Sequence, residues 1–269
     1  MHSNLFLRLV SALVLIPVVL GPILYGKTIY ENYNIPVYPM MLAILGTIMA
    51  WEWGKMFQKS GSCTQLATAL TAGMVAFMTE ANPAFCLWLI LVGTSVVFLM
   101  TKNIKYAAGV VYICLPILSL GYIYYVQENI SREIVLWLIF VVWATDVGGY
   151  VFGKTIGGPK IAPKISAKKT WAGLFGAIFF AMIVAYVFGL YLKAYKLLPA
   201  DDFILKLVVS AGVLAVIAQI GDFFESAIKR KLGLKDSSNL IPGHGGVFDR
   251  IDGLMFASVA TALALFFVN

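Results

Sequence analysis

Residues 203–268 read FILKLVVSAGVLAVIAQI (203–220), GDFFESAIKRKLGLKDSSNLIPGHGGVFDRID (221–252) and GLMFASVATALALFFV (253–268). Two apolar runs therefore enclose one segment that is dense in acidic and basic residues. Only 12% of the whole chain is charged, and charged groups beside hydrocarbon are unfavourable unless a partner compensates them. The pattern predicts two membrane-spanning helices joined by a charged segment that binds a ligand.

The rest of the chain is similarly apolar. Its 269 residues are 61% hydrophobic and have a mean hydropathy of +0.88, whereas soluble domains carry about 25% charged residues. Because the apolar runs are long enough to cross a bilayer, we expect an all-α, polytopic integral membrane protein with about nine transmembrane helices. The first run is interpreted as a retained span rather than a cleaved signal peptide. The expected spans are 9–25, 37–54, 64–79, 84–101, 106–126, 134–152, 171–192, 203–220 and 253–268.

Basic residues are distributed unevenly between the connecting segments. Three quarters of the 20 Lys and Arg residues fall on the side that carries the N-terminus, and such residues favour the cytoplasmic side of a membrane. We therefore expect a cytoplasmic N-terminus, an outside C-terminus, and two cytoplasmic polar loops, 153–170 and 221–252, in the cell (inner) membrane. Residues 1–130 are predicted to form a scaffold of helices, and residues 131–269 the catalytic transmembrane region.

The first polar loop predicts a phosphate site. Asp146 lies near the end of the sixth apolar run, where a carboxylate is unfavourable unless it is paired or hydrated. Lysines follow it, including Lys154, and we favour Lys168 and Lys169 as phosphate ligands because a helix N-terminus there adds its own positive end. Residues 148–155 also match the G-x-x-x-x-G-K-[ST] pattern of nucleotide-binding loops. We reject that interpretation because they end an apolar helix, where glycines serve close packing or an unwound end.

The second polar loop predicts a metal site. Asp222, Ser226 and Lys229 share one face if the eighth helix continues to about residue 232, and Asp249 and Asp252 open the last helix. Neighbouring carboxylates repel unless a cation lies between them. Asp222 and Asp249 are therefore expected to bind Mg²⁺, which prefers oxygen ligands and keeps waters and phosphate oxygens. Such a site suits phosphoryl or nucleotidyl transfer, in which positioning and charge neutralisation dominate.

The second loop also contains a longer pattern, Ser226-x-Ile228-Lys229-Arg230, four residues, Lys235-Asp236-x-Ser238, two residues, Ile241-Pro242-x-His244-Gly245-Gly246-Val247-x-Asp249-Arg250-Ile251-Asp252. This pattern resembles the signature of the phosphatidate cytidylyltransferases, or CDP-diacylglycerol synthases. Residues 152–154, 162–166 and 169–171 are similar to the family's other cytoplasmic loop. Before about residue 140, only Trp51-Glu52-Trp53 looks similar to the family.

The resemblance implies that CTP and phosphatidic acid react to give CDP-diacylglycerol and pyrophosphate, with Mg²⁺ required. The predicted catalytic residues are Asp222, Asp249 and Lys169, and the two aspartates bind the metal. The expected partners are CTP, phosphatidic acid and the lipid bilayer, without nucleic acid; a second cation such as K⁺ and a homo-oligomer are left open. The predicted substrate-binding residues are Asp146, Lys154, Lys168, Ser226, Lys229, Arg230, Lys235, Asp236, His244, Gly245, Gly246, Arg250 and Asp252.

Two other functions are left open by the sequence. A CTP-dependent kinase of a polyprenol or another lipid would use the same nucleotide and metal but transfer the γ-phosphate. It would release CDP, whereas cytidylyl transfer releases pyrophosphate. A membrane transporter would line its path with the intramembrane acids Glu52 and Asp146, but it gives no role to the charged segment 221–252.

Overall fold

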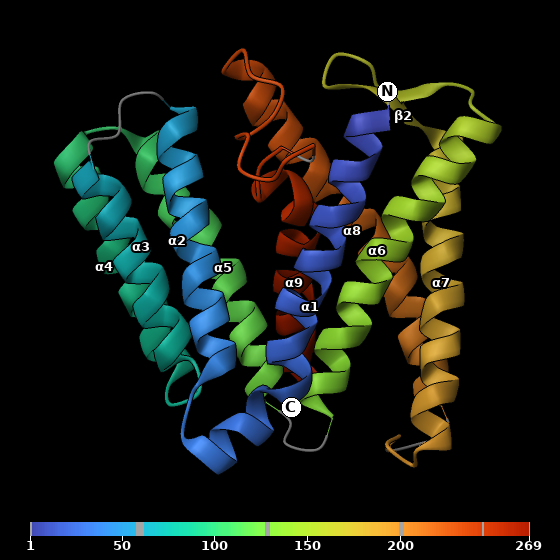
Figure 1. The fold of residues 1–269 in the computed structure, drawn as a ribbon, viewed down its shortest axis with the longest axis horizontal. Coiled ribbons are helices and arrows are strands. Elements are labelled where there is room, and N and C mark those ends of the chain that lie inside the picture. The colour runs from blue at the N-terminus through green and yellow to red at the C-terminus, as the bar shows by residue number, and fades with distance from the viewer. Residues whose placement is uncertain (1, 58–61, 127–129, 199–201, 244, 269) are drawn as a thin grey trace. The chain divides into compact units, whose positions relative to one another are not determined.

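The computed structural model describes residues 2–57, 62–126, 130–198, 202–243 and 245–268. Within these ranges the chain forms nine helices and one two-stranded hairpin (Figure 1). The hairpin strands are β1 (Lys160–Ala162) and β2 (Ser166–Thr170). The helices are α1 (His2–Tyr33), α2 (Val37–Met56), α3 (Ser62–Met78), α4 (Pro83–Thr101), α5 (Ile104–Tyr125), α6 (Ser131–Thr155), α7 (Trp171–Ala194), α8 (Phe203–Lys231) and α9 (Phe248–Val268).

The predicted all-α architecture is confirmed in the described ranges, and the helices suit a multi-pass membrane protein. Seven of them are long and apolar enough to cross a membrane, namely α4 to α9 and the Leu13–Tyr33 part of α1. Large apolar side chains such as Leu91 and Phe175 are exposed, as expected of helices that face lipid. Helices α2 and α3 form where spans were predicted but are not among these seven. Nine spans and the orientation of the termini therefore stay predictions.

The helices fall into two compact units. Unit 1 comprises Met1–Val126 and Lys231–Ile251, and unit 2 comprises Gln127–Arg230 and Asp252–Asn269. The segment between α8 and α9 therefore packs with the N-terminal helices, although it is close in sequence to the helices of unit 2. The predicted functional division at residue 130 stays a prediction, since it concerns a catalytic role rather than packing.

Unit 1 is built around α2, α3 and α5, which pack against one another. Small residues permit close approach: a Cβ at Gly46 of α2 would lie 2.6 Å from the Cβ of Ala72 on α3. The ring of Tyr38 stacks on Tyr124 with centroids 3.8 Å apart, and its hydroxyl donates to the Leu120 carbonyl at 3.1 Å. This packing fixes α2, which carries Glu52 in its last turns.

Unit 2 is dominated by the contact between α6 and α7. A Cβ at Gly148 would lie 2.4 Å from the Gly176 carbonyl oxygen, so the two backbones approach more closely than any larger residue permits. Helix α6 ends at Thr155, and Gly157 follows with φ of +67°, which is the left-handed backbone common after a helix end. Close packing or a helix end was predicted for Gly149, Gly153 and Gly157. Gly157 stands at the helix end, and the closest approach is made by Gly148 instead.

Both predicted polar loops contain regular secondary structure. The first contains the hairpin, in which Lys160 pairs with Thr170 and Ala162 with Ser166; this hairpin was not predicted from the sequence. In the second, α8 continues to Lys231, which confirms the predicted extension of the eighth helix. The remaining part, from residue 232 to 247, folds back on itself where Ile241 and Gly245 exchange two backbone hydrogen bonds of 2.8 and 3.1 Å.

Candidate active site

Unit 2 contains a cavity of about 410 Å³ whose lining includes four lysines and two aspartates. It lies between the end of α6, the hairpin, the start of α7 and α8. The predicted residues Asp146, Lys154, Lys168, Lys169 and Asp222 all line it, so the structure brings this part of the predicted site together. The other lining residues are Thr145, Gly149, Tyr150, Gly153, Lys160, Ala167, Thr170, Gly173 and Gln219.

Lys169 and Asp222 form the central contact of this cavity. The Lys169 ammonium makes an ion pair with Oδ2 of Asp222, and the Ser226 hydroxyl donates to Oδ1 of the same carboxylate at 3.2 Å. The ammonium also lies 4.7 Å from the centre of the Phe223 ring. Asp222 therefore already holds a cation, and it contacts two other predicted site residues, Lys169 and Ser226.

The two adjacent lysines, Lys168 and Lys169, stand on β2 immediately before α7. Thr170 caps that helix, because its Oγ1 accepts a hydrogen bond of 3.1 Å from the Gly173 nitrogen. The next residue is also anchored, since the Trp171 nitrogen donates to the Pro159 carbonyl at 3.2 Å. The predicted helix start is confirmed. It places two ammonium groups beside the positive end of a helix, an arrangement that favours phosphate.

Three other acidic side chains of unit 2 lie within electrostatic range of Asp252. Asp252 on α9 interacts with Asp222 and Glu225 on α8 and with Asp146 on α6. Its Oδ1 also accepts a hydrogen bond of 2.8 Å from the Gly253 nitrogen. Asp146 and Asp252 were predicted to bind substrate; Asp146 lines the same cavity as Asp222, and Asp252 interacts with Asp222. The concentrated negative charge favours cations.

Lys229, predicted to bind phosphate, is buried in an ion pair. Its ammonium lies 2.9 Å from Oε1 of Glu225, one turn earlier on α8, and the two side chains are 8% and 1% exposed. The next residue, Arg230, is exposed. Lys229 thus has a structural partner in addition to any phosphate.

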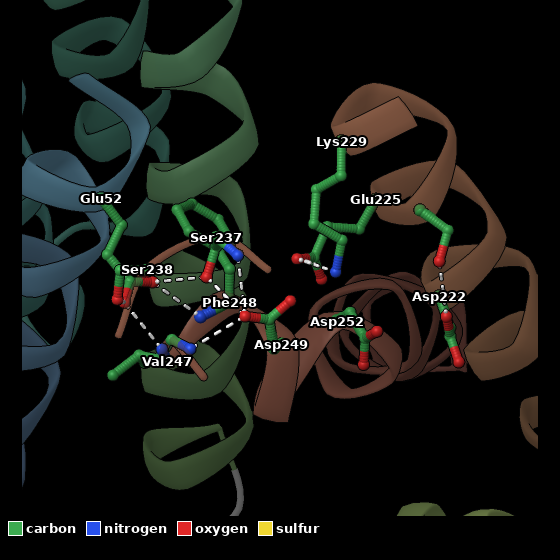
Figure 2. Close-up of polar contacts among 12 residues, drawn as sticks. Glu52, Asp222, Glu225, Lys229, Ser237, Ser238, Val247, Phe248, Asp249 and Asp252 are labelled. Atoms are coloured by element: carbon green, nitrogen blue, oxygen red, sulfur yellow. Dashed lines mark hydrogen bonds and ion pairs between the residues drawn. The ribbon is translucent and has the colours of Figure 1, made fainter. Parts of the chain in front are cut away.

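In unit 1 the carboxylate of Asp249 is fixed by three donors (Figure 2). Its Oδ2 accepts hydrogen bonds from the backbone nitrogen of Ser237 at 2.8 Å, the hydroxyl of Ser237 at 2.9 Å and the nitrogen of Gly246 at 2.8 Å. Asp249 stands in the first turn of α9. Its orientation is therefore set by the segment that precedes the helix.

The glycines of this segment are required by close contacts. A Cβ at Gly246 would lie 1.9 Å from Oγ of Ser237 and 2.5 Å from Oε1 of Glu52, while Gly245 has φ of +87°. Both were predicted site residues and lie beside Asp249. Three charged residues from the same prediction, Lys235, Asp236 and Arg250, are exposed in this unit. The predicted His244 lies outside the described residues.

The donors present fit Mg²⁺, a hard cation that takes oxygen ligands. Asp222 already carries an ammonium where a metal would bind, and Asp146 and Asp252 add negative charge nearby. In the described part of the chain, no three His, Cys, Asp or Glu side chains converge on one metal position, so phosphate oxygens and waters would complete the coordination. Asp222 and Asp249 belong to different units, and their shared metal stays a prediction.

Three residues of the polar network were given no part in the enzymatic reaction by the sequence. Glu52, Ser237 and Ser238 are all buried and joined by hydrogen bonds. Ser238 is a fixed position of the signature and Glu52 lies between two tryptophans, so both stood in patterns that resemble the family. Their partnership was not predictable, because 186 positions separate them.

Comparison with known proteins agrees with the resemblance seen in the sequence. A Rickettsia bellii (strain RML369-C) protein named phosphatidate cytidylyltransferase is 31% identical over 271 residues, covering 99% of this chain and 91% of the relative. A Pseudomonas aeruginosa protein of the same name is 29% identical over 264 residues, covering 93% of each. A third, from Brucella suis biovar 1, is 40% identical over 152 residues, or 56% of this chain and 53% of the relative. The model of the cytidylyltransferase family matches residues 6–268, and the chain belongs to that family.

Proposed function

We propose that this protein is a phosphatidate cytidylyltransferase, which converts CTP and phosphatidic acid into CDP-diacylglycerol and pyrophosphate. The observation that carries the proposal is the lysine-lined cavity of unit 2, with Lys169 bound to Asp222. Relatives with this name match nearly the whole chain. A cavity with four lysines suits phosphorylated substrates, because ammonium groups neutralise phosphate charge.

In the proposed reaction an oxygen of the lipid phosphate forms a bond to the α-phosphorus of CTP. The bond from that phosphorus to the bridging oxygen breaks, and pyrophosphate leaves with the electron pair. A phosphate monoester is already ionised near neutral pH, so no side chain needs to remove a proton. The residues of the site therefore act mainly by positioning and by neutralising charge.

The roles of individual residues follow from where they lie. Lys154, Lys160, Lys168 and Lys169 line the cavity and would hold phosphate groups of CTP or of the lipid. Asp222 and Asp249 would hold Mg²⁺, which supplies charge neutralisation between the phosphates when bound. A second cation such as K⁺ is compatible with the acidic surroundings of Asp222.

The position of the label in the product tests the reaction. With purified protein, phosphatidic acid and CTP labelled at the α-phosphorus, we expect labelled lipid, and with CTP labelled at the γ-phosphorus we expect labelled pyrophosphate. Lipid labelled from the γ-phosphorus, together with free CDP, would instead identify a lipid kinase. Asp222→Asn serves as the control for activity that comes from this site, and it should lower turnover by about 10²-fold or more.

We also propose that the chain has nine spans and a cytoplasmic N-terminus. The site would face the cytoplasm, and the membrane would be the cell (inner) membrane. A homo-oligomer is the assembly to be tested. The lysines of residues 153–170 support this orientation. In a background with Cys63→Ser, a Lys164→Cys variant should react with a membrane-impermeant maleimide in inside-out vesicles. Reaction only in right-side-out vesicles would reverse the orientation. Light scattering in detergent would give the oligomeric state.

A further inference from the structure

We propose that Glu52 is a positioning residue for the reaction. Its buried carboxylate fixes the segment from Ser237 to Phe248 and, through that segment, the orientation of Asp249. The inference rests on the proposed function only where it assigns Asp249 to the reaction. The contacts of Glu52 themselves belong to unit 1 and do not depend on what the protein catalyses.

Glu52 lies on α2 with 0% of its surface exposed. Four donors face its carboxylate, and all come from residues 237–248 (Figure 2). Oε1 accepts from the Ser238 hydroxyl at 2.5 Å and from the Val247 nitrogen at 2.9 Å. Oε2 accepts from the Phe248 nitrogen at 2.9 Å and faces the Ser237 hydroxyl at 3.3 Å. A buried carboxylate is tolerated because donors surround it.

The two backbone donors are amides at the start of α9, which begins at Phe248. The first amides of a helix have no partner within the helix and carry its positive end. A carboxylate is favourable there because its negative charge faces the positive end of the helix, and here it comes from another helix rather than from the preceding residue. Glu52 therefore fixes both the place where α9 begins and the direction in which its first turn leaves.

Asp249, in that first turn, shares donors with Glu52. The Ser237 hydroxyl lies within hydrogen-bond distance of both carboxylates, at 3.3 Å from Glu52 and 2.9 Å from Asp249. Gly246 donates its nitrogen to Asp249 at 2.8 Å, and a Cβ at this glycine would lie 2.5 Å from Glu52. A shift of the segment away from Glu52 therefore moves the donors that orient Asp249.

Glu52→Gln tests this role with little change in volume. A glutamine offers one acceptor oxygen, and its NH₂ group would face donors, so part of the network must open. Hydrogen exchange, followed by mass spectrometry without substrates, should show exchange in the peptide spanning 237–248 that is about tenfold faster or more, as expected on losing a charge-assisted hydrogen bond. Glu52→Asp keeps the charge, so the exchange rate of this peptide should lie between the rates of Glu52→Gln and the unmodified protein.

The Mg²⁺ dependence of turnover supplies a second measurement, which a purely structural role of Glu52 would leave unchanged. For Glu52→Gln we expect the Mg²⁺ concentration at half-maximal activity to rise about tenfold or more, with an unchanged amount of folded protein. Glu133→Gln is the matched control, because Glu133 is also a buried glutamate but lies in unit 2 and pairs with Arg132. It should leave both readouts unchanged. If Glu52→Gln does not accumulate, Ser238→Ala removes one donor to Glu52 and should shift both readouts in the same direction.

The outcomes separate the inference from the proposed function. Unchanged exchange in residues 237–248, or lost activity with an unchanged Mg²⁺ dependence, would overturn the positioning role. Faster exchange confined to this segment supports the contacts of Glu52 even if the protein forms no CDP-diacylglycerol, in which case the proposed function fails. Faster exchange throughout unit 1 would show that Glu52 serves general stability, and it would also overturn the proposal.

Discussion

The hydroxyl of Ser238 donates a hydrogen bond of 2.5 Å to the carboxylate of Glu52, across 186 positions of the chain. This contact joins the segment that carries most of the signature to a helix of the N-terminal unit. It also bears on the transporter hypothesis, in which Glu52 would line a path. A carboxylate surrounded by four donors from one segment is bound within the protein, so the structure gives no support to that path at Glu52.

We expect Gly246→Ala to abolish most activity. The added Cβ would meet Ser237 and Glu52 at 1.9 and 2.5 Å, so the network around Asp249 must move. Gly73→Ala is the control in the same unit, since nothing lies within 4 Å of its Cβ. In a helix this change should stabilise by about 0.5–1 kcal/mol. Turnover and thermal unfolding in detergent check both variants, and an active Gly246→Ala would contradict the contacts.

The buried pair of Glu225 and Lys229 predicts a test by single and double substitution. Removing one partner leaves an uncompensated buried charge, so Lys229→Met alone should lower stability by about 3–5 kcal/mol. The double variant with Glu225→Leu should regain most of it, because two apolar side chains replace the pair. Thermal unfolding in detergent gives the comparison.

Activity of the same double variant decides whether Lys229 also binds phosphate. We expect turnover to stay low although the fold is restored, since the ammonium is gone. Recovery of turnover would instead assign Lys229 to structure alone.

The close contact between α6 and α7 predicts different effects at two adjacent glycines. Gly148→Ala places a Cβ 2.4 Å from the Gly176 carbonyl oxygen, whereas at Gly149 the nearest atom lies at 3.7 Å. Overpacking of this kind costs about 1–3 kcal/mol. The unfolding temperature of Gly148→Ala should therefore fall, and that of Gly149→Ala should not. Equal effects would mean that the helices can separate to accept a methyl group.

Thr155→Ala should leave turnover unchanged. In a nucleotide-binding loop of the G-x-x-x-x-G-K-[ST] type this hydroxyl would bind Mg²⁺. Here residues 148–155 belong to α6, their backbone amides serve the helix, and the Thr155 hydroxyl donates to the Val151 carbonyl at 2.8 Å. A strong loss of activity would instead support a nucleotide-binding loop at residues 148–155.

Most of the helices were predictable from the sequence, because a long apolar run in a membrane protein has few possible structures other than a spanning helix. The predicted runs at 203–220 and 253–268 became α8 and α9, and the face shared by Asp222 and Ser226 extended α8 as expected. The hairpin was not predictable, because its strands, KIA and SAKKT, lack an apolar alternation and depend on pairing across a turn.

Parts of the candidate site were predictable where its residues lie close together in the sequence or where basic and acidic residues face each other. The signature located Asp249 and the glycines before it, and the lysine pair pointed to the start of α7. Contacts across distant helices were not predictable: the burial of Lys229 against Glu225 depends on how α8 packs, and Glu52 gave no sign of its partners. Charge patterns identify candidate ligands, but only packing tells which of them are already engaged.

The cap that Thr170 provides for α7 has a consequence for how phosphate would be captured. Thr170 is buried, it pairs with Lys160 across the hairpin and it holds Gly173 by a hydrogen bond, so the backbone of Lys168 and Lys169 is in place before a ligand arrives. Binding then immobilises lysine side chains, at about 0.5–1.5 kcal/mol each, rather than folding a loop. The ionic-strength dependence of binding would report the lysine charges themselves, with no folding transition superimposed on it.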